Sequence, residues 1–211
     1  MNTRPDRTSR FQELADSYLE HIRILVQVGD CAANVRDFIG PWWTFQRAAA
    51  APGNDILIHT NRDVGIWLNN PCPHHAKPQL QLQDWISEGA WQAMERKACK
   101  TTWAASPDKM PTKPRSQWSD HYKMDRLIID HAVPIKVIRD MLFARERKAE
   151  YSCKENLKGF LEGYVKHGVL TEKENALLDC KSLNSSMPAS WNGVDPYARY
   201  SDVAIKQSVI E

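Results

Sequence analysis

The fold of the carboxy-terminal half is decided by the run Leu127-Ile128-Ile129-Asp130-His131-Ala132-Val133-Pro134. Its apolar start predicts a short strand over 126–131, and Pro134 suits the first turn of a following helix. Neighbouring residues of a strand point to opposite faces, so Asp130 and His131 can serve different parts of one site. The pair predicts either a reactive centre at a strand end or a turn at a solvated rim.

The residues after Pro134 predict three helices and a second strand. Thr171-Glu172-Lys173-Glu174 has the pattern of a capping box, which makes Glu174 a helix cap rather than a metal ligand. Gly168-Val169-Leu170 is a short apolar run, which we interpret as a strand. If it pairs with the first strand, the helix after it packs beside both and can face His131. Helical spacing of apolar residues places the helices over 135–150, 154–166 and 171–180.

The amino-terminal half predicts more helices and a small hairpin. Gly40-Pro41 is expected to break the chain between two helices, since proline lacks the backbone N–H that a helix interior needs. Two short apolar runs, 55–59 and 64–68, are separated by a turn-rich link and predict the hairpin. The helices are expected over 11–28, 31–38, 42–51 and 80–100.

Composition places the chain among ordinary globular proteins. It has 211 residues, of which 42% are hydrophobic and 26% charged, enough for one sizeable core. Five widely spaced cysteines without a Cys-x-x-Cys pair indicate neither a disulfide framework nor a zinc ribbon, so a reducing, cytoplasmic location is expected. The first ten residues are polar, no run approaches membrane-spanning length, and no membrane partner is expected.

A basic, proline-rich stretch predicts contact with nucleic acid. Between positions 96 and 115 six basic residues stand against Asp108 alone, a net charge of +5, and tryptophans flank or interrupt the stretch. Basic side chains neutralise phosphates and aromatic rings stack on bases. The alternative is a solvated linker anchored by its tryptophans. The expected contact residues are Arg96, Lys97, Lys100, Trp103, Lys109, Lys113 and Arg115, with Arg199 as a further phosphate contact or a partner in a salt bridge.

The Asp-His-x-x-Pro run, followed by a second strand and a helix, resembles the HNH or ββα-metal nucleases. The resemblance implies that Asp130 binds a divalent metal such as Mg²⁺, while His131 acts as the general base on water. It also implies a further ligand on the following helix, for which Asn175 and His167 are the alternatives. Family members keep the two strands close in sequence, whereas two helices are expected between them here.

Together these patterns predict an α+β protein, mostly α-helical, with a small antiparallel sheet and a ββα-metal-like core in the carboxy-terminal half. We expect an amino-terminal helical region over 1–103, a basic linker over 104–117 and an HNH-like domain over 118–211. The implied function is metal-dependent hydrolysis of DNA, as in restriction or phage-associated enzymes. The alternative is a regulatory protein that binds DNA or protein without catalysis. The sequence leaves open whether the chain forms a homodimer.

Overall fold

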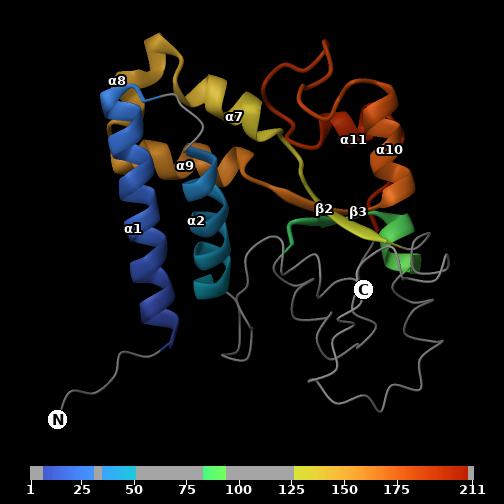
Figure 1. Ribbon diagram of the computed structural model, residues 1–211, viewed down its shortest axis with the longest axis horizontal. Coiled ribbons are helices and arrows are strands. Elements are labelled where there is room, and N and C mark those ends of the chain that lie inside the picture. Colours follow the sequence, from blue (N-terminus) through green and yellow to red (C-terminus); the bar gives the residue numbers. More distant parts are fainter. Residues whose placement is uncertain (1–6, 31–34, 51–82, 94–125, 209–211) are drawn as a thin grey trace.

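The computed structural model describes residues 7–30, 35–50, 83–93 and 126–208, and the statements below concern these residues. Within them the fold is α+β and mostly helical, as the sequence predicts, but the three-stranded sheet is mixed rather than antiparallel (Figure 1). The expected hairpin over 55–68, the linker over 104–117 and the basic segment lie outside the described residues. None of the described helices is long and apolar enough to cross a membrane.

Five helices from both halves of the chain share one core. The first helix, α1 (Arg7–Val28), buries a stripe of apolar residues at helical spacing against α2 (Val35–Ala50), and the two lie side by side in Figure 1. The core is completed by α7 (Ile135–Leu142), α8 (Lys148–Tyr151) and α9 (Lys154–Tyr164). Packing therefore joins the predicted amino-terminal region to the carboxy-terminal half. The buried residues include Leu19, Ile22, Ile39, Trp42, Ile138, Leu142, Leu157 and Leu161.

The expected break at Gly40-Pro41 is wrong, because α2 continues through Pro41 as a single helix. A proline inside a helix removes one backbone hydrogen bond and typically costs about 3 kcal/mol. The residues around it, Ile39, Trp42 and Trp43, are all buried. Full burial of an apolar side chain contributes roughly 1.5–3 kcal/mol. Burial on both sides of the proline therefore offsets the missing bond, and local propensity is overridden.

The single helix expected over 135–150 is also wrong. Helix α7 ends at Leu142, and a 3-10 turn (Arg145–Arg147) separates it from the short α8. Residues 144–150 contain no large apolar side chain that could hold a longer helix against the core. The next anchor is Tyr151, which is buried with its ring 4.7 Å from that of Phe160. The chain turns so that this ring reaches the core.

The sheet has the strand order β1-β3-β2. Strand β2 (Leu127–His131) pairs antiparallel with β3 (His167–Thr171), which confirms the two predicted strands and their pairing. Strand β1 (Trp85–Ile86) runs parallel to β3 and lies inside the range 80–100 that was expected to be helical. Only residues 88–93 of the described part of that range are helical, and the Ser87 hydroxyl caps this helix by accepting from the Ala90 N–H.

Different helices pack against the two faces of the sheet. On one face Ile86, Leu127 and Val169 pack against the helix at 88–93. The other face is covered by α10 (Glu172–Cys180) and α11 (Ala198–Asp202), whose Leu178 and Tyr200 pack with Ala132. The predicted capping box of α10 is confirmed: the Thr171 hydroxyl accepts from the Glu174 N–H, and the Glu174 carboxylate accepts from the Thr171 N–H.

Candidate functional site

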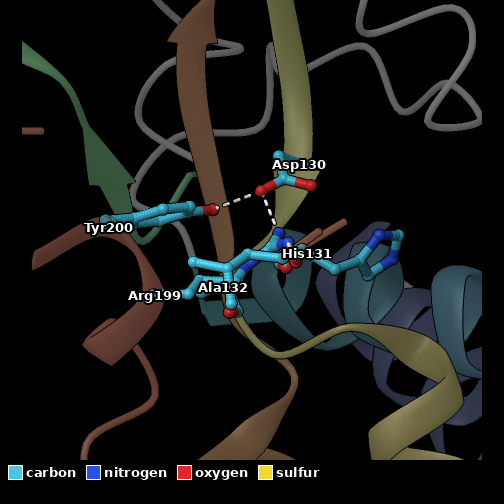
Figure 2. Close-up of polar contacts among 6 residues, drawn as sticks. Asp130, His131, Ala132, Arg199 and Tyr200 are labelled. Carbon is cyan, nitrogen blue, oxygen red and sulfur yellow. Dashed lines mark hydrogen bonds and ion pairs between the residues drawn. The ribbon is translucent and has the colours of Figure 1, made fainter. Parts of the chain in front are cut away.

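The side chains of Asp130 and His131 lie on opposite faces of the sheet. Figure 2 shows the His131 ring pointing away from the Asp130 carboxylate, which faces Arg199 and Tyr200 of α11. This is the alternation that a strand imposes on neighbouring residues. The two residues therefore belong to two different clusters, one on each side of β2.

The first cluster is the Arg199 network, made of Asp130, Arg199 and Tyr200. Arg199 has no exposed surface, and its guanidinium donates to the Asp130 carboxylate and to the backbone carbonyl of His131. It also donates to the Ala132 carbonyl at 2.9 Å and to the Leu183 carbonyl at 2.7 Å. One side chain thus holds the end of β2, α11 and the chain after α10 together.

Tyr200 adds a second donor to the same carboxylate. Its hydroxyl donates to Asp130 Oδ2 at 2.9 Å. Burial and the nearby Asp130 charge raise the pKa of Tyr200 well above its ordinary value, so the hydroxyl keeps its proton. The Asp130 carboxylate is therefore bound by one cation and one neutral donor, an arrangement that suits a structural ion pair.

The second cluster is the histidine pair, His131 and His167. These residues are directly opposite each other in the β2–β3 ladder. Hydrogen-bonded and non-hydrogen-bonded pairs alternate along an antiparallel ladder, and the next pair, Ala132 and Lys166, is hydrogen-bonded. His131 and His167 therefore form a non-hydrogen-bonded pair. Side chains approach most closely at such positions. The ring centroids are 4.5 Å apart, and the rings meet edge to face at 87°.

Both imidazoles are neutral near pH 7. Burial, assisted by the charges of Arg36 and Arg199, lowers the pKa of His131 to about 4. The pKa of His167 is held well below its ordinary value, first by burial and then by the neighbouring His131 and Arg47. His167 is completely buried, and neither of its ring nitrogens has a hydrogen-bond partner among the described residues. Leaving a buried polar group unpaired costs about 1–3 kcal/mol.

Asp84 fixes the position of His167. The backbone of His167 donates to Asp84 Oδ2 at 3.0 Å and accepts from the Asp84 N–H at 3.1 Å. The same carboxylate oxygen accepts from the Trp43 indole N–H at 3.1 Å, and the Trp43 ring lies 3.9 Å from the His167 imidazole. Arg47 and Lys166 approach the other oxygen at 3.4 and 3.8 Å. Asp84 thereby connects α2 to β3 on either side of the His167 imidazole.

The predicted site residues do not form a single site. His131 and His167 are brought together, whereas Asp130 lies on the other face. Asn175 lies in α10, which begins directly after Thr171. Thr171 pairs with Leu127 at one end of the β2–β3 ladder, and the histidine pair lies at the other end. Arg199 is buried with its donors bound within the protein, so the expected phosphate contact does not fit and the alternative salt bridge does. The remaining predicted contacts, Arg96, Lys97, Lys100, Trp103, Lys109, Lys113 and Arg115, lie outside the described residues.

Sequence reasoning did not find the residues that hold these clusters together. Asp84, Trp43 and Tyr200 come from three elements far from Asp130 and His131 in the chain, and no spacing pattern links them. Among the described residues no group of three or more His, Cys, Asp or Glu side chains is placed to hold a metal ion. The geometry offers an ion pair between Asp130 and Arg199 on one face and two neutral imidazoles on the other.

Comparisons with known proteins add no relative. No protein-family model matches the chain, and neither the curated proteins nor the solved structures contain a significant match.

Proposed function

We propose that this protein binds nucleic acid without hydrolysing it, and that the Asp130-His131 run serves the stability of the sheet. The observation that carries this proposal is the ion pair between Asp130 and the buried Arg199. A carboxylate that holds a catalytic metal must offer its oxygens to the ion, whereas Oδ2 of this one already accepts from both Arg199 and Tyr200. Removing the arginine from it would leave a buried cation unpaired, which is costly.

The state of His131 supports the same reading. A general base works best when its pKa lies near the working pH, and burial lowers the pKa of His131 to about 4. Asp130, its predicted metal-binding neighbour, faces the other side of the sheet. The acid and the imidazole are therefore poorly placed to act on one phosphodiester.

The proposed contact with nucleic acid is the basic segment at 96–115. The composition of this segment supports the proposal, because the segment carries a net charge of +5 and contains Trp103. Each phosphate that a cationic side chain neutralises releases counterions, so binding through this segment weakens steeply with salt. We take DNA as the partner.

The second candidate function is metal-dependent DNA hydrolysis with Mg²⁺ or another divalent ion. The order β2, β3, α10 favours it, because two antiparallel strands followed by a helix match the arrangement that the HNH resemblance implies. In that case His131 would act on water, and Asp130 with Asn175 or His167 would hold the metal once Arg199 had moved away.

A binding experiment with two matched variants tests the proposal. Affinity for labelled duplex DNA is measured by fluorescence anisotropy over a range of salt concentrations. In one variant Lys97, Lys100 and Lys113 become glutamine, and in the control Lys136, Lys173 and Lys206, all exposed, are changed in the same way. Removing three phosphate contacts should reduce the salt slope by about 3, while the control keeps it. Equal slopes in the two variants, or no binding at low salt, would refute the proposal.

A cleavage assay separates the two candidates. Plasmid DNA is incubated with the wild type and with His131→Gln in the presence of Mg²⁺ or Mn²⁺. We expect the plasmid to remain intact in both. Nicking by the wild type that His131→Gln abolishes would favour hydrolysis and overturn the non-catalytic proposal.

A further inference from the structure

The histidine pair lies where the helical core joins the sheet. Strand β2 continues into α7 through residues 132–134, and α9 continues into β3 through residues 165–166, so both connections run past the pair (Figure 1). Val133 and Val165, within these connections, pack in the core of the helices, whereas Val169, further along β3, packs in the sheet. A change in the pair therefore acts on the junction between these two parts of the described chain.

The two rings fill this junction as neutral groups. Their centroids are 4.5 Å apart, and the Trp43 ring of α2 lies 3.9 Å from the His167 imidazole. His167 is completely buried, and neither of its ring nitrogens has a hydrogen-bond partner among the described residues. A proton on either ring would place a cation in a buried, closely packed site, which is costly unless the cation is paired.

The charges around the junction oppose such a cation. Asp84 is the acid beside His167, but its carboxylate already lies 3.4 Å from Arg47 and 3.8 Å from Lys166. Asp130 lies on the opposite face of β2, where it pairs with Arg199. A histidinium would therefore meet a carboxylate that two cations already share. The charged groups around the pair are Arg36 and Arg47 of α2, Lys166 before β3, Arg199 of α11 and Asp84 before β1.

We propose that the histidine pair is an acid-sensitive switch: protonation separates the two rings and locally uncouples the helical core from the sheet, while the Arg199 network keeps β2 and α11 together. His131 is only partly buried, so its protonated ring can turn towards solvent. His167 then loses this ring contact, and it takes up a proton as Trp43 moves away. The switch is independent of the proposed nucleic-acid binding, because it uses no residue of the basic segment.

The direction of the switch follows from the state that binds the protons. An exposed imidazole titrates near about pH 6.5, whereas the closed junction keeps both rings neutral to lower pH. The open state therefore gains protons that the closed state does not, and opening is favoured as the pH falls below about 6.5. Above that pH both states hold neutral rings, and the opening equilibrium does not change.

The test is native-state hydrogen exchange of the full chain, followed by NMR between pH 7 and pH 5 and corrected for the intrinsic exchange rate. Two amides report on the junction: the Ala132 N–H donates to the Lys166 carbonyl at 2.8 Å, and the His167 N–H donates to Asp84 Oδ2 at 3.0 Å. Their opening constant should rise roughly 20-fold for each ring that takes up a proton, and so roughly 400-fold for both. An opening constant that stays the same from pH 7 to pH 5 would overturn the proposal.

Exchange in dilute urea separates local opening from unfolding of the whole chain. The Leu183 and Ile205 amides are hydrogen-bonded in the layer that covers the other face of the sheet, away from the junction. At pH 5 the exchange at Ala132 and His167 should hardly depend on urea, because a local opening exposes little surface, whereas the exchange at Leu183 and Ile205 should rise steeply. The same urea dependence at all four amides would mean that the junction opens only when the chain unfolds, and the switch would be refuted.

Two variants assign the effect to the pair. His131→Gln removes one titrating ring and should reduce the rise in the opening constant to roughly 20-fold. His21→Gln, in the exposed part of α1, is the matched control and should keep the wild-type rise. Equal rises in His131→Gln and the wild type would contradict the proposal.

If His131→Gln fails to fold, the wild type itself decides the question. The ring nitrogens of ¹⁵N-labelled histidines are followed by NMR over the same pH range. We expect protonation of the His131 and His167 rings to accompany the faster exchange at Ala132 and His167. Protonation of both rings without faster exchange at these amides would show that the pair does not control the junction.

Discussion

The guanidinium of Arg199 pairs with the carboxylate of Asp130, although the two residues are 69 positions apart in the chain. The same guanidinium donates to the carbonyls of His131, Ala132 and Leu183, so a single buried cation joins three segments. Such a pair adds little stability compared with apolar packing, but losing one partner leaves the other charge buried alone. The main role of the pair is therefore to fix the position of α11 against β2.

Replacing Arg199 should therefore destabilise the protein strongly. Arg199→Met keeps the volume but leaves Asp130 and three carbonyls without their donor, and we expect the free energy of unfolding to fall by about 3–5 kcal/mol. The measurement is urea unfolding followed by circular dichroism. Arg139→Met is the control, because among the described residues the Arg139 guanidinium pairs only with the adjacent, exposed Asp140, and the substitution should change stability by less than about 0.5 kcal/mol. Similar effects of the two substitutions would contradict the role given to Arg199.

The features predicted correctly from the sequence are those encoded by neighbouring residues. The strand at Leu127–His131, the opposite orientation of Asp130 and His131, and the capping box at Thr171 each depend on a few consecutive side chains. The Arg199 network could not be found in this way. An arginine in a polar stretch looks like a surface residue until the fold brings a carboxylate and three carbonyls around it.

The errors have the same origin. The continuous helix through Pro41 depends on burial of Trp42 and Trp43 in a core that distant helices complete. Strand β1 is two residues long and exists because Trp85 and Ile86 pair with Gly168 and Val169, about 80 positions later. Local propensity favours a helix at 85–86 and a break at 40–41, and tertiary contacts reverse both.

Tyr200 should contribute through its hydroxyl as well as through its ring. Tyr200→Phe keeps the ring 4.7 Å from Trp85 but removes the donor to Asp130, so we expect a loss of about 1 kcal/mol in the free energy of unfolding. Tyr197→Phe is the matched control, since Tyr197 also stacks on Trp85, at 6.1 Å, without binding Asp130. Equal losses would show that the hydroxyl bond to Asp130 does not matter.

Stability should fall in mild acid because of the histidine pair. The folded state holds the pKa of His131 at about 4 and that of His167 well below its ordinary value, whereas unfolded histidines titrate near 6.5. Below about pH 6.5 the unfolded chain binds protons that the folded chain does not, so the free energy of unfolding decreases as the pH falls towards 4. The slope is up to about 1.4 kcal/mol per pH unit for each histidine. Above pH 6.5 the pair contributes no slope.

The measurement is urea unfolding at several pH values between 4 and 8. His131→Gln should show a shallower decline in acid than the wild type, because one of the two groups no longer titrates. His21→Gln, on the exposed side of α1, should follow the wild-type curve. A wild-type curve that stays level from about pH 6.5 down to about 5 would contradict the low pKa values of the pair.

Gly168 should be intolerant of even one added carbon. It pairs with Asp130 in the ladder, and a Cβ there would lie 2.8 Å from the Tyr200 hydroxyl oxygen and 3.0 Å from its Cε2 atom. Tyr200 is 1% exposed and held by Asp130, so the ring cannot move aside freely. Overpacking of this kind typically costs 1–3 kcal/mol, and we expect Gly168→Ala to lose about that much free energy of unfolding in urea.

Gly163 in α9 is the matched control, because a Cβ there meets no heavy atom within 4 Å. Gly163→Ala should gain about 0.5–1 kcal/mol through helix propensity. If Gly168→Ala proves as stable as Gly163→Ala, the ring of Tyr200 does not lie against β3 as described.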